Sequence, residues 1–174
     1  GNGAHVTLPR HPNYIWDQLA EEGLWASVIS DGHHLPENIL KVIHRLKENN
    51  MILISDSVAL GGMVPGNYKT TVGGEVTLTN NGRLHMKDNE DLLAGSAQYL
   101  LQGIQNLVDK KIVGLEEAIH KASVYPAKLM DLPQQNGLQI GAPADLIIVD
   151  MSSNNWRVKE TYKNGKLIFK ESKV

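Results

Sequence analysis

Two short, mostly apolar segments constrain the fold of this 174-residue chain more than any other feature. Residues 25–30 and 51–54 are too short for stable helices and are rich in the side chains that favour strands. Each follows a segment, 13–24 or 36–50, in which apolar residues recur at helical spacing. Strands that are apolar along their whole length are typical of parallel sheets covered by helices on both faces. The sequence therefore predicts an α/β fold with parallel strands.

The middle of the chain has a different character. In residues 65–87, short β-prone pieces alternate with Gly-Gly and Asn-Asn-Gly turns, which predicts a β-hairpin or meander inserted into a loop. Beyond it, Ser96 is expected to cap a helix with its apolar face over 100–108, and residues 115–122 are expected to form a second short helix. Both helices would pack on the sheet.

The C-terminal tail is expected to be a separate β element. Strand-like pieces lie at 144–150, 157–162 and 166–170, and the pair Asn164-Gly165 is typical of a tight hairpin turn. Two parallel strands do not make a stable sheet alone, so we expect further strands before Gly1. The chain opens Gly-Asn-Gly, without an initiator Met or a signal-peptide pattern, and we interpret it as beginning within a longer protein.

Composition excludes several classes of function. The formal net charge is −2 and there is no long run of Lys or Arg, so the chain has no electrostatic footprint for nucleic acid or for an anionic membrane surface. The absence of cysteine excludes disulfides and cysteine-based metal sites. No apolar stretch approaches the roughly 20 residues of a membrane span. We therefore expect a cytoplasmic protein that binds neither nucleic acid nor membranes.

Polar side chains follow both apolar segments directly. His33 and His34 come soon after the first, and Asp56 comes just after the second. Side chains beyond the carboxyl ends of parallel strands face a common pocket, so we expect an imidazole and a carboxylate side by side, with only one of the adjacent histidines facing the site. Such a carboxylate can act as a general base. The alternatives are that Asp56 caps a turn beside Ser55 and that the histidines are surface residues.

Other candidate residues carry weaker signals. Arg10 lies in an irregular polar lead-in, where its guanidinium would hold a phosphate or carboxylate unless it is simply solvated. The small residues of 92–96 would let the backbone approach a ligand closely, or they would merely begin a helix. The remaining histidines show no metal-binding spacing, so the sequence assembles no complete metal site.

Taken in order, these motifs resemble the N-acetylglucosamine-6-phosphate deacetylases of the amidohydrolase superfamily over essentially the whole chain. The matching motifs are Asn2-Gly3, Arg10, Asp31-Gly-His-His34, Ser55-Asp56, Leu93-Ala-Gly-Ser96, Ala122-Ser-Val-Tyr-Pro-Ala127 and residues 137–150.

The resemblance implies a (β/α)₈ TIM-like barrel with a small β-sandwich. Residues 1–130 would be the C-terminal part of the barrel, carrying the insertion at 65–87, and residues 131–174 would be strands of the sandwich. The implied activity is hydrolysis of the N-acetyl group of N-acetylglucosamine 6-phosphate, giving glucosamine 6-phosphate and acetate. A divalent metal, commonly zinc, would be held by a Glu and two His that lie before Gly1. This chain alone would then lack the metal ligands and be inactive.

The resemblance also assigns roles to individual residues. Asp56 resembles the catalytic residue that takes a proton from the attacking water and returns it to the leaving amine. His34 resembles the histidine that contacts the substrate near the reacting group. Arg10 resembles the arginine that grips the 6-phosphate across the interface of a homodimer. The positions that match the lining of the sugar site are Asn2, Gly3, Leu93, Ala94 and Gly95.

Two other functions remain open. Asp56 is followed by Ser57 and Val58, where the family commonly has a small Ala, so the substrate is less firmly indicated than the reaction. Another amidohydrolase, acting on a different N-acyl compound or a cyclic amide, is the first alternative. The second is a non-catalytic interaction module in which Asp56 and His34 are turn residues. Exposed strand edges would also favour pairing with another chain.

Overall fold

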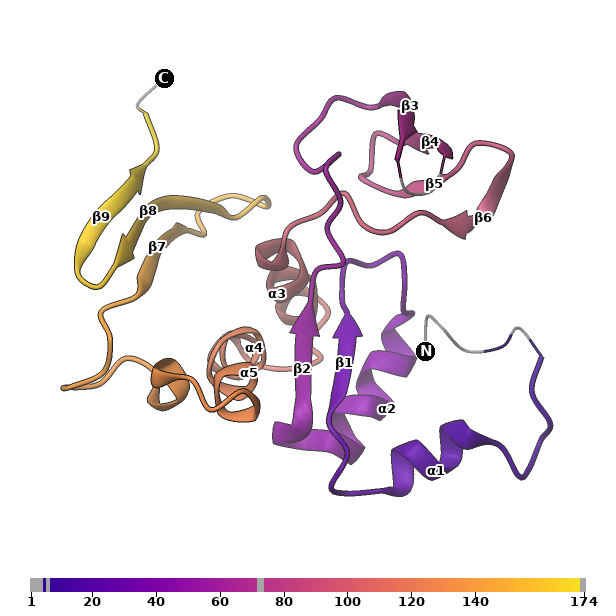
Figure 1. Ribbon diagram of the computed structural model, residues 1–174, viewed down its shortest axis with the longest axis horizontal. Helices are drawn as coiled ribbons and strands as arrows, with labels where there is room; N and C mark the ends of the chain where they lie inside the picture. The colour runs from indigo at the N-terminus through magenta and orange to yellow at the C-terminus, as the bar shows by residue number, and fades with distance from the viewer. Residues whose placement is uncertain (1–4, 6, 72–73, 173–174) are drawn as a thin grey trace.

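The computed structural model describes residues 5, 7–71 and 74–172. A mixed α/β part occupies the centre of the molecule, and two antiparallel sheets lie on different sides of it (Figure 1). The elements of the α/β part are α1 (Tyr14–Ala20), β1 (Ala26–Ile29), α2 (Glu37–Lys47), the 3₁₀ turn η1 (Glu48–Asn50), β2 (Met51–Ile54), α3 (Leu100–Asp109), α4 (Leu115–Ala122), α5 (Val124–Leu129) and the 3₁₀ turn η2 (Pro133–Asn136).

The two predicted apolar strands pair in parallel, with Ala26 opposite Met51 and Ile29 opposite Ile54. Helix α2 packs on both strands, and α3, α4 and α5 contact β2. The parallel α/β arrangement predicted from the sequence is therefore confirmed. Cover by the helices is incomplete, because Ser27 is exposed and Ile54 remains 42% exposed.

One core holds this part together. Its buried members come from both strands, from the helices and from the loops between them, and Leu40, Met51 and Leu107 are completely buried. Burying a side chain of this size contributes about 1.5–3 kcal/mol. The whole set is Val28, Leu35, Leu40, Ile43, Met51, Leu53, Ile104, Leu107, Ile112 and Ala118.

The inserted β element is larger than predicted. It has four strands in the antiparallel order β3-β4-β5-β6, and it ends at residue 93 instead of 87. The strands are β3 (Gly66–Thr70), β4 (Gly74–Leu78), β5 (Leu84–Met86) and β6 (Asn89–Leu93). The fourth strand was missed because its sequence, Asn-Glu-Asp-Leu-Leu, is mostly polar, as is usual for an exposed strand at the edge of a sheet.

Two helix predictions need correction. Helix α3 begins at Leu100 with Tyr99 at its N-cap, so Ser96 does not cap it. The Ser96 hydroxyl accepts a hydrogen bond from the backbone of Gln98 at 3.1 Å, within the preceding turn. Helix α5 was missed because Pro126 lies in it, but proline is tolerated in the first turn of a helix, where no intrahelical N–H bond is lost.

The C-terminal residues form the predicted separate sheet. Its strands β7 (Leu146–Asp150), β8 (Arg157–Lys163) and β9 (Lys166–Lys170) pair antiparallel in chain order. Asn164 and Gly165 join the last two with positive φ angles of 49° and 74°, as a type I′ turn requires. The side chain of Gln105 in α3 donates to the carbonyl of Asn154 at 2.6 Å and accepts from the N–H of Trp156 at 3.1 Å, which ties the β7–β8 connection to the α/β part.

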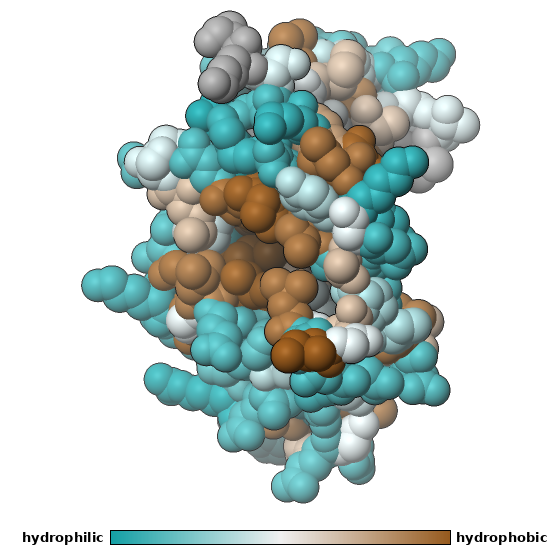
Figure 2. Space-filling model, turned by 90° about the vertical axis from the view of Figure 1, so that its left-hand side faces the viewer, coloured by the Kyte–Doolittle hydropathy of each residue, from teal (hydrophilic) through white to brown (hydrophobic). Residues whose placement is uncertain are grey.

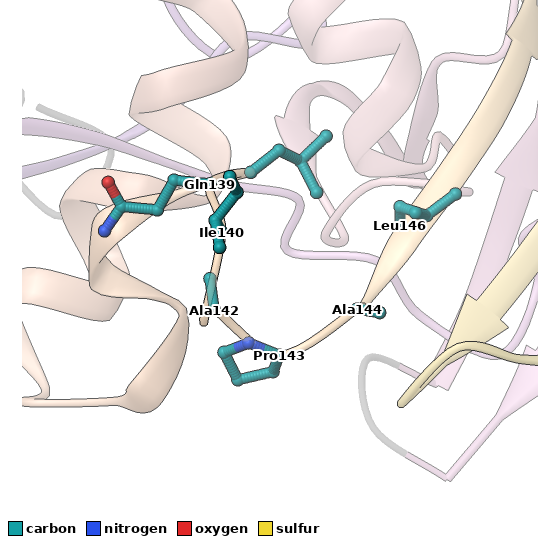
Figure 3. Close-up of a pocket in the computed structure, with 7 residues that line it drawn as sticks. Gln139, Ile140, Ala142, Pro143, Ala144 and Leu146 are labelled. Carbon is teal, nitrogen blue, oxygen red and sulfur yellow. The ribbon is translucent and has the colours of Figure 1, made fainter.

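Apolar side chains gather around a hollow on the face that lies to the left in Figure 1 (Figure 2). The segment before β7 also lines a pocket of about 420 Å³, formed by Leu138, Gln139, Ile140, Ala142, Pro143, Ala144 and Leu146 (Figure 3). None of these residues belongs to the polar cluster described below. None of the described helices has the length and apolar character needed to cross a membrane. The cytoplasmic location stays a prediction.

Candidate functional site

The candidate site lies where β1 and β2 end. The chain leaves β1 through a loop that carries His34, and it leaves β2 directly into Asp56. His34 Nε2 is 3.6 Å from Asp56 Oδ2. The sequence predicted an imidazole and a carboxylate side by side at the carboxyl end of these strands, and this geometry confirms it.

A second carboxylate holds His34 in place. The His34 side chain is only 1% exposed, and its Nδ1 lies 2.8 Å from Asp31 Oδ2. Asp31 Oδ1 also accepts the backbone N–H groups of His33 and His34, at 2.9 and 3.0 Å. Burial alone would raise the pKa of Asp31, but these three hydrogen bonds outweigh it and hold the pKa well below its usual range. Asp31 is therefore an ionised acceptor, and His34 Nδ1 donates to it.

His33 points to a different part of the molecule. Its Nε2 lies 3.2 Å from the carbonyl oxygen of Asn81, in the turn between β4 and β5, and 3.2 Å from Gln98 Nε2. The loop after β1 thus contacts the β3–β6 sheet through one histidine and the site through the next. The expectation that only one of the two histidines faces the site is confirmed.

Asp56 combines an unusual backbone with an available carboxylate. Its φ is +51°, a left-handed conformation that non-glycine residues seldom adopt. Its side chain is 46% exposed and accepts no hydrogen bond from the described residues. The turn is instead capped by Ser55, whose hydroxyl accepts from the N–H of Ser57 at 3.2 Å. This pattern does not support the alternative in which Asp56 serves as the turn cap.

An isolated parallel β-bridge between Ser57 and Ser96 holds Gly95 beside Asp56. The N–H of Ser96 donates to the carbonyl of Asp56, and the N–H of Val58 donates to the carbonyl of Ser96, both at 2.9 Å. Gly95 has a φ of +82°, and a Cβ there would lie 2.7 Å from Val58 Cγ1 and 3.7 Å from Asp56 Oδ2. Only glycine fits this position without displacing a neighbour.

Helix α3 supports the loop that carries His34. The amide of Asn106 donates to the carbonyl of Ser30 at 2.8 Å. Gly103 faces the same residue so closely that a Cβ there would lie 2.7 Å from Ser30 Oγ. The position of His34 is thus set by packing on a helix as well as by Asp31.

The other predicted site residues lie in different places. Leu93 ends β6, and Ala94 donates its N–H to the carbonyl of Leu84 at 3.1 Å, so both lead directly into Gly95. Arg10 is exposed in the lead-in segment, which runs out to one side of α1 and α2 (Figure 1), and it forms no ion pair within the described part of the chain. Asn2 and Gly3 lie outside the described residues.

Asp31 is the residue of this cluster whose contact with His34 sequence reasoning missed. The sequence showed it only as part of the motif that runs to His34. The sequence nevertheless contained a signal for this contact. An Asp side chain readily accepts hydrogen bonds from the backbone N–H groups two and three residues later in the chain.

The described residues hold no cluster of three or more His, Cys, Asp or Glu side chains able to bind a metal ion. His34, Asp31 and Asp56 therefore do not form a metal centre by themselves. What they offer chemically is a buried ring nitrogen without a partner beside a half-exposed carboxylate. This pair can accept hydrogen bonds from a ligand, and the carboxylate can move a proton.

Comparison with known proteins gives a consistent result. The sequence profile of the Amidohydrolase family matches residues 4–168. N-acetylglucosamine-6-phosphate deacetylase of Vibrio furnissii is 29% identical over 97% of this chain and 41% of its own length. N-acetylgalactosamine-6-phosphate deacetylase of Escherichia coli O157:H7 is 27% identical over 95% of this chain and 42% of its own length. The chain thus spans about two fifths of these relatives.

Solved structures show the same likeness. The crystal structure of N-acetyl-D-glucosamine-6-phosphate deacetylase from Mycobacterium smegmatis superposes with a TM-score of 0.79 and 25% identity, over 92% of this chain and 42% of that one. The Thermotoga maritima enzyme of the same name gives a TM-score of 0.75 at 24% identity, over 89% and 41%. The arrangement of elements described above is therefore that of part of these proteins.

Proposed function

Because this chain belongs to the amidohydrolase family, we propose that it forms part of an enzyme that hydrolyses the N-acetyl group of N-acetylglucosamine 6-phosphate, giving glucosamine 6-phosphate and acetate. The observation that carries the proposal is that His34 Nε2 lies 3.6 Å from Asp56 Oδ2 at the carboxyl ends of two parallel strands. In α/β proteins this edge of the sheet is where ligands bind and where catalytic side chains gather.

In this proposal Asp56 is the catalytic acid and base. Its carboxylate accepts a proton from the attacking water and returns it to the leaving amine as the C–N bond breaks. The half-exposed carboxylate is accessible to a substrate, and no hydrogen bond from the described residues competes for it. His34 presents its Nε2 to the substrate near the reacting group. The alternative of a non-catalytic interaction module gives no reason for a buried, unpaired ring nitrogen beside this carboxylate.

A divalent metal, commonly zinc, is part of the proposal because deacetylases of this family are generally metal-dependent. Such a metal polarises the acetamide carbonyl and activates water. The described residues do not supply a complete set of ligands for it. We propose that its ligands lie in other parts of the enzyme, and the roles of Asp56 and His34 given above do not depend on contact with it.

Binding of the sugar phosphate is assigned to the remaining candidates. The guanidinium of Arg10 is exposed and has no partner in the described part of the chain, so it is free to bind the 6-phosphate. We propose that it serves a neighbouring subunit in a homodimer. Asn2, Gly3 and the backbone of Leu93, Ala94 and Gly95 are proposed to line the sugar site.

The finer description of the fold belongs to the same proposal. Residues 1–130 are assigned to the C-terminal part of a (β/α)₈ barrel, with the insertion now extending over 66–93, and residues 131–174 to strands of a β-sandwich. The parallel pair β1–β2 with its covering helices supports the first assignment. The separate antiparallel sheet β7–β9 supports the second.

N-acetylgalactosamine 6-phosphate is a second candidate substrate. The Escherichia coli relative that carries this name matches nearly as much of the chain, at 27% instead of 29% identity. The two sugars differ only in the orientation of one hydroxyl group. An amidohydrolase that acts on another N-acyl compound or on a cyclic amide would not need a phosphate.

The test is release of acetate by the whole protein with added divalent metal. We expect turnover of at least one of the two N-acetylhexosamine 6-phosphates. The unphosphorylated sugar should have a kcat/KM lower by about 10- to 100-fold, which is the effect of losing a charge-assisted hydrogen bond. Equal rates with and without the phosphate would favour the alternative amidohydrolase. Binding of the sugar phosphate without any acetate release would favour the interaction module.

A further inference from the structure

The loop between β1 and α2 holds a carboxylate, that of Asp31, which is too buried to contact a ligand directly. The side chain of Asp31 is 5% exposed, and both of its oxygens are occupied: Oδ1 by two backbone N–H groups and Oδ2 by the ring of His34. A carboxylate held by two N–H groups of its own loop cannot rotate without breaking them. Its orientation is therefore fixed before any ligand binds.

We infer that Asp31 is a positioning residue that fixes His34 as the Nδ1–H tautomer, so that His34 Nε2 faces the ligand as a hydrogen-bond acceptor beside Asp56. The inference deepens the proposed function and rests on it for the identity of the ligand. The tautomer follows from the donor inventory, because an ionised carboxylate only accepts and a neutral imidazole carries one proton. With that proton on Nδ1, Nε2 is left with its lone pair.

His34 Nε2 and the Asp56 carboxylate, both hydrogen-bond acceptors, determine which chemical group can bind between them. His34 Nε2 is buried without a hydrogen-bond partner, and a buried polar atom that stays unpaired is destabilising. The Asp56 carboxylate, 3.6 Å away, is also an acceptor. A ligand group with two hydrogen-bond donors is therefore the group that satisfies both side chains.

The leaving nitrogen of an acetamide becomes such a group during hydrolysis. Water adds its oxygen to the acetyl carbon and gives one proton to Asp56. As the C–N bond breaks, the nitrogen takes this proton from Asp56 and keeps its own N–H, which can donate to His34 Nε2. The products are the free amine and acetic acid, so the atoms balance.

The tautomer can be measured without turnover. In the whole protein labelled with ¹⁵N-histidine, long-range ¹H–¹⁵N correlation spectra at pH 8 distinguish a protonated ring nitrogen from one with a lone pair. The signals of His34 are those that His34→Gln removes. We expect Nδ1 to be protonated and Nε2 to carry the lone pair. A proton on Nε2 in the unmodified protein, alone or together with one on Nδ1, would overturn the inference.

Asp31→Asn provides the matched perturbation. Its amide oxygen can still accept the backbone N–H groups, but its NH₂ group would face the His34 ring, so Nδ1 becomes the acceptor and the proton moves to Nε2. We expect the tautomer to reverse in Asp31→Asn and to stay unchanged in the exposed control Asp88→Asn. A folded Asp31→Asn protein with the original tautomer would count against the inference. If this variant does not fold, the spectrum of the unmodified protein still decides.

Kinetics separate this inference from the proposed function. We expect Asp31→Asn to lower kcat on the order of 100-fold or more with little change in KM, because the affected hydrogen bond forms as the amine leaves. The expected tautomer in a protein that hydrolyses no amino-sugar phosphate would refute the proposed function and leave the role of Asp31 intact. Hydrolysis by a protein with the proton on Nε2 would refute the role of Asp31 and support the proposed function.

Discussion

The two ends of the β1–β2 sheet treat buried polar groups in opposite ways. At the carboxyl end, His34 Nε2 has no hydrogen-bond partner and Asp56 is half exposed with a positive φ. At the amino end, Lys121 is completely buried, yet its ammonium group donates to the carbonyl of Glu48 at 2.5 Å and pairs with Glu117 Oε1 at 2.9 Å. We call the carboxyl end the open end, because its polar groups are available to a ligand. We call the amino end the closed end, because its buried polar groups are paired with one another.

Tyr125 completes the closed end. Its hydroxyl lies 2.8 Å from both Asn49 Oδ1 and Glu117 Oε2, and its ring lies under the Lys121 ammonium, 5.3 Å from the centroid. Burial, together with the hydrogen bond to Glu117, raises the pKa of Tyr125 to about 12. The difference between the ends is the one expected of a parallel α/β protein, in which the carboxyl end serves function and the amino end serves stability. Substitutions at the two ends should therefore change different quantities.

The largest effect is expected from Asp56→Asn at the open end. An amide cannot take up and return the proton, so we expect kcat of the whole protein for acetate release to fall by about 100- to 10,000-fold. The midpoint of thermal unfolding should hardly change, because no hydrogen bond from the described residues depends on this carboxylate. Steady-state kinetics together with calorimetry would show both. The exposed Asp88→Asn should leave kcat unchanged, and retained turnover in Asp56→Asn would remove its proposed role.

Lys121→Met at the closed end should give the opposite result. Methionine fills a similar volume but cannot bond to Glu48 or Glu117, so we expect the free energy of unfolding to fall by about 3 kcal/mol. Urea denaturation of the whole protein measures this loss, and kcat at 25 °C should stay within about twofold of the unmodified value while the protein is folded. The control is Lys128→Met, because Lys128 is exposed, its ammonium lies 5.7 Å from the centroid of the Tyr125 ring, and it forms no ion pair within the described residues.

A large loss of kcat in a folded Lys121→Met protein would contradict the division between the two ends. It would mean that a change at the amino end of β2 reaches the residues beyond its carboxyl end.

Gly95→Ala tests how tightly the open end is packed. The new methyl group would lie 2.7 Å from Val58 Cγ1 at a backbone φ of +82°, so we expect a loss of about 1–3 kcal/mol in the free energy of unfolding. Val58→Ala removes the steric clash but not the backbone strain, so Gly95→Ala should cost less stability in a Val58→Ala protein than in the unmodified one. An equal cost in both backgrounds would mean that backbone strain alone accounts for the effect.

The same comparison explains what the sequence could and could not predict. Strands β1 and β2 were predicted because short, mostly apolar runs are a local signal. The approach of His34 to Asp56 then followed from the geometry of parallel strands, in which consecutive carboxyl ends meet at one edge. Strand β6 was missed because an exposed edge strand carries little apolar signal. The isolated β-bridge between Ser57 and Ser96 was missed because it joins positions far apart in the chain.

The closed end had no signal of this kind. Lys121 and Glu117 are four residues apart in a helix, which predicts an ordinary surface ion pair. Burial of Lys121 depends on the carbonyl of Glu48, which is distant in the sequence and whose residue has a φ of +43°. The position of Arg10 was also beyond the sequence, because Arg10 lies in an irregular segment before α1.

The smallest effect on stability is expected from Asp31→Asn, and its pH dependence tests whether the open end is preorganised. The pKa of Asp31 in the folded protein lies below its ordinary value of 3.8, because its hydrogen bonds outweigh burial. The unfolded chain therefore takes up this proton first as the pH falls. The stability that the carboxylate contributes is present above about pH 4 and is lost as the pH falls through the folded pKa.

At pH 7 we expect Asp31→Asn to be less stable by about 1 kcal/mol, because neutral hydrogen bonds replace charged ones. Urea denaturation from pH 7 to pH 2.5 should show the two curves converging, whereas Asp88→Asn should run parallel to the unmodified protein. A constant difference for Asp31→Asn over this range would mean that Asp31 titrates alike in the folded and unfolded chains, so that its carboxylate is not held by the loop that carries His34.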